Sequence, residues 1–323
     1  MCVGNGNFLL EVSQENPEAA RIELESLGKD NFQFIRGSAS TFEIMGNADP
    51  ARDSVFVKSI SNILLKGSDL DDLGSVVLPA GKFYVRFRDA DRCGAVYSES
   101  EIGNILGARG RVDFRNPDFT VRVVHDGCVY VGIEERLAGR SDLEERRPPK
   151  RPFFSPISIH PKFARFMVNI SRTKPGDTIL DPFCGTGGIL IEAGLMGRHV
   201  IGSDSSYAMV RGARLNLKYY GISDPVVSRS DVKDLEVKRN VDAIVSDLPY
   251  GRNSEVLGED LKTLYSVSLS KFHALLQRDK LAVLAVSDPD NLDTTGGQFE
   301  VMSVTPVRQH KSLTRYFVVL KSL

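Results

Sequence analysis

A glycine-rich turn between an apolar strand and an apolar helix constrains the fold of this chain most. The stretch is DTILDPFCGTGGILIEAGLMG, residues 177–197. Glycines at such a turn let the backbone approach a ligand beside a helix N-terminus, as in nucleotide-binding folds. Leu190 stands where a dinucleotide G-x-G-x-x-G needs its third glycine, and the G-K-[ST] of a phosphate loop is missing. Asp181, ahead of the glycines, would repel a pyrophosphate and attract the cationic end of a ligand.

Residues 158–323 alternate between strand and helix patterns, which indicates a mostly parallel sheet covered by helices on both faces. A helix is expected over 161–172, and the last apolar segments, 299–304 and 315–320, suit a terminal strand pair. We therefore predict an open α/β sheet in this part of the chain. The other expected strands are residues 178–181, 199–203, 225–229, 241–246 and 281–287.

The first half of the chain has the pattern of small α+β modules. Apolar residues in 51–65 recur at helical spacing. Ser98 and Glu101 have the spacing of a capping box at a helix start. Asp126-Gly127 is a dipeptide typical of β-hairpins. The expected strands are residues 7–12, 31–35, 41–45, 82–88, 119–124 and 128–133, and the expected helices are 16–27, 51–65 and 98–107.

Residues 139–157, GRSDLEERRPPKRPFFSPI, are first charged and then rich in proline. This composition disfavours a packed element and predicts a linker between two domains.

The composition is that of an ordinary globular protein, with a formal net charge of −1. This charge gives no support to a strongly basic nucleic-acid binder. No apolar run approaches the roughly 20 residues of a membrane helix, and no signal peptide is evident. The four cysteines lack C-x-x-C spacing and the five histidines are isolated, so we expect a reducing, cytoplasmic environment and no metal site.

Acidic residues close successive strands of the predicted sheet. Asp204 ends the strand HVIGSD, where an acid can bind the two hydroxyls of an adenosine ribose. Asp231, in SRSDV, follows the next strand and could accept a hydrogen bond from an adenine amine. Each acid alone is equally well a turn former at a strand end. Together with Asp181 they favour a ligand that has an adenosine and a cationic amino-acid tail, which is S-adenosylmethionine.

The stretch VDAIVSDLPYGR, residues 241–252, ends a strand on Asp247 and enters a turn at once. Asp, Pro and Gly are ordinary turn formers, so a plain strand end is one interpretation. With the features above, however, the chain resembles the class I methyltransferases, and DLPYG resembles their [DNS]-P-P-[YFW] motif for amino groups of bases. The resemblance implies that Asp247 and the Leu248 carbonyl accept hydrogen bonds from such an amine, and that Tyr250 stacks on the base.

Leu248 departs from this motif because it replaces the first proline. The carbonyl that the motif uses is still present, and Pro249 biases Leu248 toward the extended conformation. The replacement adds a free N–H and a bulkier, looser side chain. We expect it to tune the site without inactivating it.

A wider resemblance covers nearly the whole chain. RPFFSPISIHPKFARFMVNISR, leading into the glycine-rich turn, is similar to the archaeal tRNA guanine-10 N2-methyltransferases. SESEIGNILGARGRVDFRNPDFTVRVVHDGCVYVGI resembles a THUMP domain, an RNA-binding module. The fold implied is a Rossmann-like class I methyltransferase domain with a mostly parallel sheet, helices on both faces and a terminal antiparallel strand. The implied parts are a ferredoxin-like segment at 1–48, the THUMP domain at 49–138, the linker at 139–157 and the methyltransferase domain at 158–323.

The resemblance implies transfer of methyl groups from S-adenosylmethionine to the exocyclic N2 amine of guanosine-10 in tRNA, giving the mono- and dimethylated base. The THUMP domain would hold the 3′ end of the tRNA, and the catalytic domain would act on the flipped guanine. We expect a monomer. The catalytic residues are then Asp247, Leu248, Pro249 and Tyr250, and the cofactor contacts are Asp181, Phe183, Cys184, Gly185, Thr186, Gly187, Asp204, Ser205, Asp231, Val232 and Asp247.

Basic clusters would contact RNA phosphates and make binding depend on salt. A basic cluster is otherwise just a solvated face. The clusters are Arg109, Arg111 and Arg115; Arg146, Arg147, Lys150 and Arg151; and Arg308, Lys311 and Arg315.

Several alternatives remain at this stage. The substrate could be a guanosine elsewhere in tRNA or in ribosomal RNA, or an adenine amine in DNA, although the THUMP resemblance argues against DNA. A non-catalytic RNA-binding protein is a third reading, and Leu248 is its only support. Cys184 suits a small buried side chain better than a nucleophile, because amine methylation needs no covalent enzyme intermediate. Phe154 and His160 could cover the cofactor or simply pack.

Overall fold

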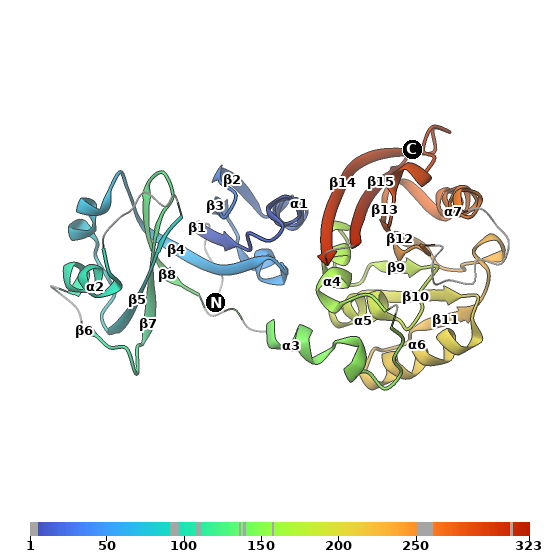
Figure 1. Cartoon of the computed structure of the whole chain (residues 1–323), viewed down its shortest axis with the longest axis horizontal. Coiled ribbons are helices and arrows are strands. Elements are labelled where there is room, and N and C mark those ends of the chain that lie inside the picture. Colours follow the sequence, from blue (N-terminus) through green and yellow to red (C-terminus); the bar gives the residue numbers. More distant parts are fainter. Residues whose placement is uncertain are drawn as a thin grey trace. The chain divides into compact units, whose positions relative to one another are not determined.

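The chain is divided into two compact units, Met1–Ala138 and Gly139–Leu323 (Figure 1). The computed structural model describes residues 6–90, 97–107, 111–135, 137, 140–156, 158–250, 261–310 and 313–323. Each unit has its own sheet and its own apolar core. Within these described ranges, no helix is both long enough and apolar enough to cross a membrane.

The first unit is built on one mixed sheet, whose described strands follow the order β2-β3-β1-β4-β8-β7-β5-β6. Most neighbours are antiparallel, but β5 runs parallel to both β6 and β7. The strands are β1 (Gly6–Val12), β2 (Phe32–Gly37), β3 (Thr41–Gly46), β4 (Val57–Gly67), β5 (Lys82–Asp89), β6 (Arg111–Val112), β7 (Phe119–His125) and β8 (Val129–Glu134).

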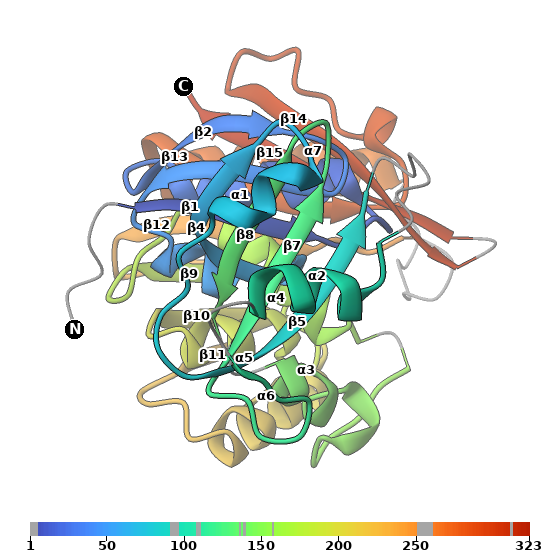
Figure 2. The ribbon, with the colours of Figure 1, turned by 90° about the vertical axis from the view of Figure 1, so that its left-hand side faces the viewer.

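Local sequence signals fix the helices and the hairpin of this unit. Pro17 stands at the start of α1 (Pro17–Gly28), where its missing N–H costs nothing. α2 (Glu99–Gly107) begins with the predicted capping box: Glu101 N donates to Ser98 Oγ at 3.2 Å, and Ser98 N donates to Glu101 Oε2 at 2.7 Å. The predicted β7–β8 hairpin turns at Gly127, whose φ is 63°. α2 packs against β5 (Figure 2).

The helix expected over 51–65 is wrong. Asp49–Asp53 forms a short 3-10 helix, η1, and the chain then extends into β4. β4 pairs with β1 along its first half, up to Asn62, and with β8 along its second half, from Ser61 to Gly67, so the whole strand is tied into the sheet. This pairing overrides the helical spacing of its apolar residues, several of which are β-branched and suit a strand.

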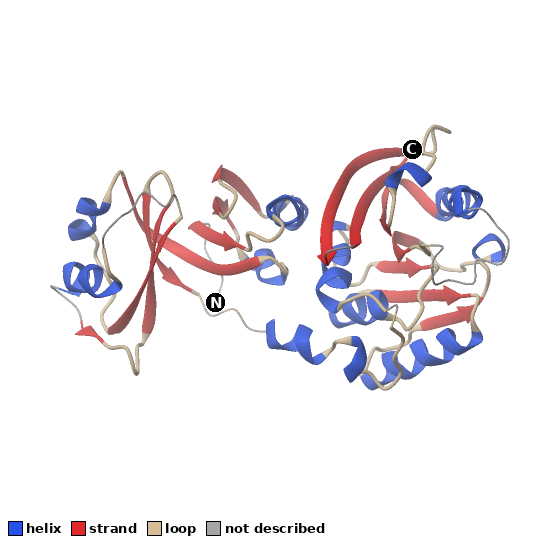
Figure 3. Cartoon of the chain, in the orientation of Figure 1, coloured by secondary structure: helices blue, strands red, loops and turns tan. Residues whose placement is uncertain are grey.

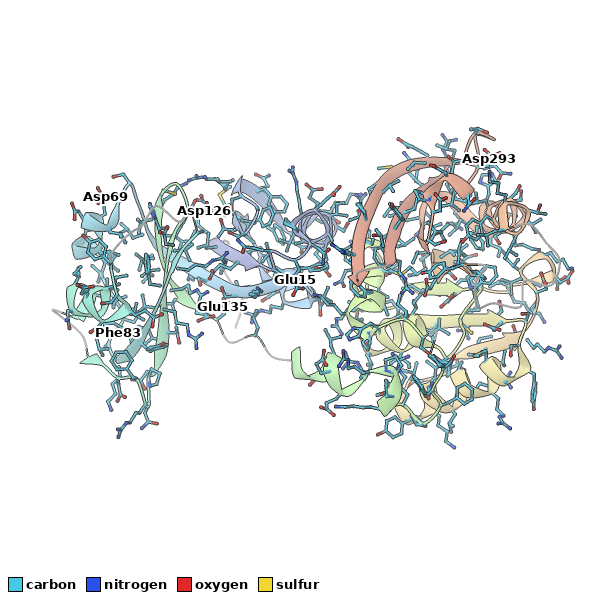
Figure 4. The ribbon with its side chains drawn as sticks, viewed as in Figure 1. Glu15, Asp69, Phe83, Asp126, Glu135 and Asp293 are labelled. Atoms are coloured by element: carbon cyan, nitrogen blue, oxygen red, sulfur yellow. The ribbon has the colours of Figure 1, made fainter. Side chains whose placement is uncertain are left out.

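One apolar cluster of the first unit lies between its sheet and α2. Phe83 of β5 (Figure 4) belongs to it, as do the fully buried Ile102 of α2 and residues of η2 (Leu70–Ser75). Asp126, in the turn between β7 and β8, accepts a hydrogen bond from Ser38 Oγ at 2.6 Å and another from Thr41. These bonds join the hairpin to the turn between β2 and β3 and make one continuous unit.

The second unit has a mostly parallel sheet flanked by helices, as predicted (Figure 3). Its described strands follow the order β11-β10-β9-β12-β13-β15-β14, in which β11 to β13 are parallel and β15 and β14 form an antiparallel end. The elements are α4 (Pro161–Ile170), β9 (Thr178–Asp181), α5 (Gly188–Leu195), β10 (His199–Asp204), α6 (Tyr207–Tyr219), β11 (Val226–Arg229), β12 (Val241–Asp247), α7 (Leu261–Leu275), β13 (Leu276–Val286), β14 (Phe299–His310) and β15 (Leu313–Ser322).

Alternating side chains of this sheet are buried on two opposite faces. On β15, Val318 and Leu320 join the apolar cluster that contains Tyr265 of α7. Phe317, on the opposite face, packs its ring against Phe166 of α4 at 5.2 Å between centroids. Because successive residues of a strand point to opposite faces, α4 and α7 cover different faces of the sheet.

The stretch predicted as a linker without packed structure in fact packs against the second unit. Its described residues include α3 (Arg140–Glu145) and a short 3-10 helix, η3 (Pro148–Lys150). The Arg146 guanidinium donates to both oxygens of the buried Glu192 of α5, at 2.7 and 3.0 Å. Asn216 of α6 binds the backbone N and O of Phe153, each at 2.9 Å. That part of the prediction is wrong, because the charged and backbone groups of the stretch find partners on α5 and α6.

Candidate active site

Three of the predicted acids end adjacent parallel strands of the second unit. Asp204 ends β10, Asp181 ends β9 and Asp247 ends β12, and these strands are neighbours in the sheet. The carboxyl ends of parallel strands meet at one edge, which is where open α/β sheets bind ligands. The structure therefore brings together the three side chains that the sequence placed far apart.

The glycine-rich turn follows Asp181 and leads directly into α5. Gly185 and Gly187 have φ values of 50° and 81°, in the left-handed region that favours glycine. Apart from the two chain neighbours of Gly185, no described residue has an atom within 4 Å of the position that its Cβ would occupy. The backbone is thus exposed to an approaching ligand here, next to the N-terminus of a helix.

Asp204 fixes this turn from the neighbouring strand. Its Oδ2 accepts a hydrogen bond from Gly185 N at 2.9 Å, and its Oδ1 accepts one from Ser206 N at 2.9 Å. Burial raises the pKa of Asp204, and these two backbone bonds oppose that rise. A carboxylate has about four lone-pair sites, so two remain for the hydroxyls of a ribose. The geometry fits the role predicted for this acid.

Asp181 is the most buried acid of the edge, with 1% of its surface exposed. Ser246 Oγ and Phe183 N both donate to its Oδ1, at 2.6 and 3.2 Å. Burial raises the pKa of Asp181 to about 7, and the nearby charges of Asp247 and Asp204 add to that rise. A cation bound at this edge would relieve both effects, so these acids fit the ammonium and sulfonium charges of S-adenosylmethionine.

Asp247 lies where β12 passes into the predicted base-binding turn. The Tyr250 hydroxyl donates to Asp247 Oδ1, and Arg315 Nη2 lies 3.5 Å from Asp247 Oδ2. Burial raises the pKa of Asp247, whereas Arg315 and the Tyr250 hydroxyl lower it. Tyr265 Oη donates to the Pro249 carbonyl at 2.7 Å and holds the turn from α7.

Leu248 differs from its expected behaviour in two respects. Its N–H is not free, because it donates to the Ala285 carbonyl at the end of β13 at 3.0 Å. Its side chain is not loose either, because it is 2% exposed and belongs to the apolar cluster beneath the sheet. The hydrogen bond to Ala285 and the buried side chain therefore restrict the backbone at Leu248, as a proline ring would at this position.

Other predicted cofactor residues lie around this edge in different environments. Asp231 is exposed, and its carboxylate caps a short 3-10 helix, η4 (Val232–Asp234), by accepting from Lys233 N at 3.1 Å. Val232 is buried in the core, and Ser205 is exposed. Cys184 is buried, and burial raises the pKa of its thiol, as expected for a small core side chain and not for a nucleophile.

Several residues that position the site escaped the sequence reasoning. Ser246 directly precedes Asp247 in the strand and holds Asp181 of the neighbouring strand. Asn216 Nδ2 donates to the Thr186 carbonyl at 2.9 Å, and Ser158 Oγ lies 2.8 Å from Thr186 Oγ1. No motif marks these side chains. The only signal for Ser246 was its nearness to Asp247 in the sequence. The only signal for Asn216 was a polar residue on the otherwise apolar buried face of α6.

The sequence left open whether Phe154 and His160 cover the cofactor. Within the described residues, neither side chain forms a hydrogen bond with the glycine-rich turn. The ring of Phe154 is exposed. His160 caps α4, since its Nδ1 accepts from Lys162 N at 3.1 Å, and burial lowers its pKa. Ordinary capping accounts for His160. Within the described part of the chain, no group of three or more His, Cys, Asp or Glu side chains is arranged to hold a metal ion.

Three members of the basic clusters are not available for RNA phosphates. Arg146 is paired with Glu192, and Arg151 and Arg315 are buried, with 5% and 9% of their surfaces exposed. The expectation of phosphate contacts is wrong for these three. Arg109, Lys311 and the side chain of Arg111 lie outside the described residues, and the exposed members are Arg115, Arg147, Lys150 and Arg308.

Comparison with known proteins assigns the chain to a family. The family model described as an RMKL-like methyltransferase domain matches residues 148–316. The chain is 38% identical to the tRNA (guanine(10)-N2)-dimethyltransferase of Methanothermobacter thermautotrophicus, over 97% of this chain and 99% of that one. It belongs to the tRNA (guanine(10)-N2)-dimethyltransferase family.

Two further comparisons agree with this family assignment. The relative from Pyrococcus abyssi, which carries the same name, is 33% identical over 98% of this chain and 99% of its own length. The solved structure of TrmN from Thermus thermophilus is similar with a TM-score of 0.58, at 22% identity, over 98% of this chain and all of that chain. At this low identity the likeness to TrmN concerns only the fold. The match includes residues of both units.

Proposed function

We propose that this protein transfers methyl groups from S-adenosylmethionine to the exocyclic N2 amine of guanosine-10 in tRNA, producing the mono- and dimethylated base. The observation that carries the proposal is the position of the DLPY turn. Asp247 ends the strand next to Asp181, and Asp181 and Asp204 frame the glycine-rich turn. A base amine bound at Asp247 would therefore lie beside a methyl donor bound at the other two acids. The archaeal relatives that match nearly the whole chain support the substrate.

The residues of the turn supply what a poor nucleophile needs. The lone pair of the guanine N2 amine is delocalised into the ring, so the amine has to be oriented by acceptors on its two N–H groups. The Asp247 carboxylate and the Leu248 carbonyl are the two acceptors, and both are held by backbone pairing of β12 and β13. S-adenosylmethionine, when bound, supplies an electrophilic methyl group on a sulfonium. Orientation of the amine toward that methyl group is the main contribution of the chain.

The acidic edge fits the cofactor as a charged ligand. Asp204 keeps acceptor capacity for the ribose hydroxyls, while Asp181 is poised to lose its proton when a cation binds beside it. Asp231 and Val232 would flank the adenine from the end of β11. Asp247 would then take part in both sites, because it closes the strand next to Asp181.

The first unit would supply the grip on RNA. Within it we assign residues 1–48 to a ferredoxin-like segment and 49–138 to a THUMP domain that holds the 3′ end of the tRNA, while the second unit acts on the flipped guanine. The helix α2 packed on β5 and the β7–β8 hairpin support a compact α+β module in that region. A tRNA substrate also supports action in the cytoplasm.

The test is incubation of the purified chain with total tRNA and methyl-labelled S-adenosylmethionine, followed by digestion and mapping of the modified nucleosides. When the substrate tRNA comes from cells that lack the enzyme, the reaction should produce N2-methylated guanosine at position 10. Asp247→Ala should abolish transfer while cofactor binding, measured by calorimetry, persists. Asp242→Ala, at the opposite end of the same strand, is the matched control and should retain activity. Near-normal transfer by Asp247→Ala would refute the assigned role, and label at another position would redirect the substrate assignment.

A further inference from the structure

Arg315 occupies the edge of the active site that faces away from the cofactor turn. It lies on β15, which pairs with β13 so that Tyr316 is opposite Val286, near the carboxyl end of the parallel strands. Its side chain is 10% exposed. Arg315 Nη2 lies 3.5 Å from Asp247 Oδ2, and the guanidinium carbon lies 5.1 Å from the centre of the Tyr250 ring. The side chain thus contacts both residues proposed to bind the base.

Stability alone does not explain this arginine. Its Nε is buried and has no hydrogen-bond partner within the described part of the chain. A buried donor without a partner costs about 1–3 kcal/mol. A 3.5 Å contact with one carboxylate oxygen is a loose ion pair, which offsets little of the cost of taking a guanidinium out of water. A buried charge held at such a cost, beside a catalytic carboxylate, points to a role in function.

Arg315, Asp247 and Tyr250 form a closed set in which each side chain contacts the other two. The Tyr250 hydroxyl donates to Asp247, and the guanidinium lies over the Tyr250 ring. Arginine favours the face of an aromatic ring through a cation–π interaction. One face of the Tyr250 ring is therefore covered, so a flat base can stack only on the other face.

On the basis of the proposed function, we propose that Arg315 is a positioning residue for methyl transfer. It keeps Asp247 as a carboxylate that can accept from the target amine, and it fixes the Tyr250 ring so that the base stacks on a single face. The arginine acts through these two side chains and not as a phosphate contact.

The charges around Asp247 support this role. Burial favours the neutral acid of Asp247, while the charge of Asp247 in turn helps to raise the pKa of Asp181 on the neighbouring strand. Arg315 is the group that opposes the effect of burial on Asp247 most strongly, and the Tyr250 hydroxyl helps by hydrogen bonding. Tyr265 also lies near this charge, but burial raises the pKa of its hydroxyl, so it stays neutral. Without Arg315, Asp247 would hold a proton to higher pH, and a protonated acid accepts the amine poorly.

The pH dependence of kcat/KM separates this role from a structural one. Arg315→Gln should lower kcat/KM for tRNA at least tenfold at pH 7, and its acidic limb should move to higher pH by about one unit or more. Part of the activity should return at high pH. Arg315→Lys keeps the charge without the planar fork, so it should restore the pH profile but not the full rate. Arg278→Gln, an exposed position near the start of the paired strand β13 and away from Asp247, is the matched control and should leave the profile unchanged.

A second measurement needs no RNA substrate. Aspartate labelled with ¹³C at the carboxyl group gives a titration curve for Asp247, assigned by the signal lost in Asp247→Ala. In Arg315→Gln this curve should move to higher pH, and in Arg278→Gln it should not. An unchanged titration curve of Asp247 in Arg315→Gln would overturn the proposal. An unchanged pH profile with weaker tRNA binding would also overturn it, and would make Arg315 an RNA contact instead. If the wild-type protein methylates no tRNA, the proposed function fails, and the carboxyl titration still decides whether Arg315 controls Asp247.

Discussion

Asp181→Asn is the sharpest perturbation of the acidic edge. The wild-type carboxyl is 1% exposed, and burial, with the charges of Asp247 and Asp204, raises its pKa to about 7 from an ordinary value of 3.8. Asparagine has almost the same shape and keeps an oxygen for the hydrogen bonds from Ser246 and from Phe183 N. It cannot ionise. The substitution therefore removes the charge and retains most of the packing.

The sign of the effect of pH on stability depends on whether the folded or the unfolded state binds the Asp181 proton more tightly. The folded protein binds the Asp181 proton more strongly than the unfolded chain does. This stabilising contribution is fully present below pH 3.8 and is lost as the pH rises through about 7. Each pH unit between the two pKa values changes it by about 1.4 kcal/mol. Between pH 5 and pH 8.5 the ligand-free wild-type protein should therefore lose on the order of 3 kcal/mol that Asp181→Asn keeps.

Differential scanning calorimetry is a suitable assay, because the two units can unfold in separate transitions. The second unit comprises Gly139–Leu323, and for a domain of this size 1 kcal/mol shifts Tm by about 2–4 °C. Asp181→Asn should unfold close to the wild-type temperature at pH 5 and about 6–12 °C above it at pH 8.5. The affinity of the variant for the cofactor should fall, although its stability rises, since it lacks the carboxylate that a cation would bind. A temperature difference that is the same at both pH values would refute a titrating Asp181.

Two further predictions concern the turn and the RNA surface. Leu248→Pro restores the family motif, but it removes the N–H that donates to Ala285 and replaces a buried side chain. It should therefore destabilise the second unit by about 1–3 kcal/mol, which the same calorimetric scan would measure. Because the carbonyl of residue 248 remains, turnover per folded molecule should stay within a few-fold of wild type, and a complete loss would contradict this account. Affinity for tRNA should fall steeply with salt, and Arg308→Gln should reduce the slope of log K against log salt by about 1, whereas the buried Arg315 should contribute nothing to that slope.

The sequence was sufficient to predict the sheet and its acidic edge, because both depend on local patterns. Strand–helix alternation predicts a parallel sheet, and acids at the ends of successive strands then have to meet at one edge. Asp181, Asp204 and Asp247 are found there for this reason. The strand β4 was missed because its pairing with two distant strands, and not its own spacing of apolar residues, decides its conformation.

Those partners of the charged groups that come from distant parts of the chain could not be predicted. Arg315 follows Asp247 by 68 positions and reaches it through the antiparallel strand β15, whose place next to β13 no local pattern specifies. The same holds for Glu192, which pairs with Arg146 across 46 positions and so fixes a stretch whose composition suggested a linker. Charged residues in a sequence look alike whether they face water or each other, and only the packed sheet distinguishes the two.

The last two residues of β12 show how one strand end can serve two ligands. Ser246 turns toward Asp181 and orients the acid proposed for the cofactor, while Asp247 is the acceptor proposed for the base amine. Consecutive side chains of a strand point to opposite faces, so Ser246 and Asp247 can serve different groups from the same strand end. Both side chains are then positioned by a strand that pairs with β13 as far as Asp247, and not by loops. Leu248 extends this rigidity by one residue, because its N–H continues the pairing with β13 before the turn begins.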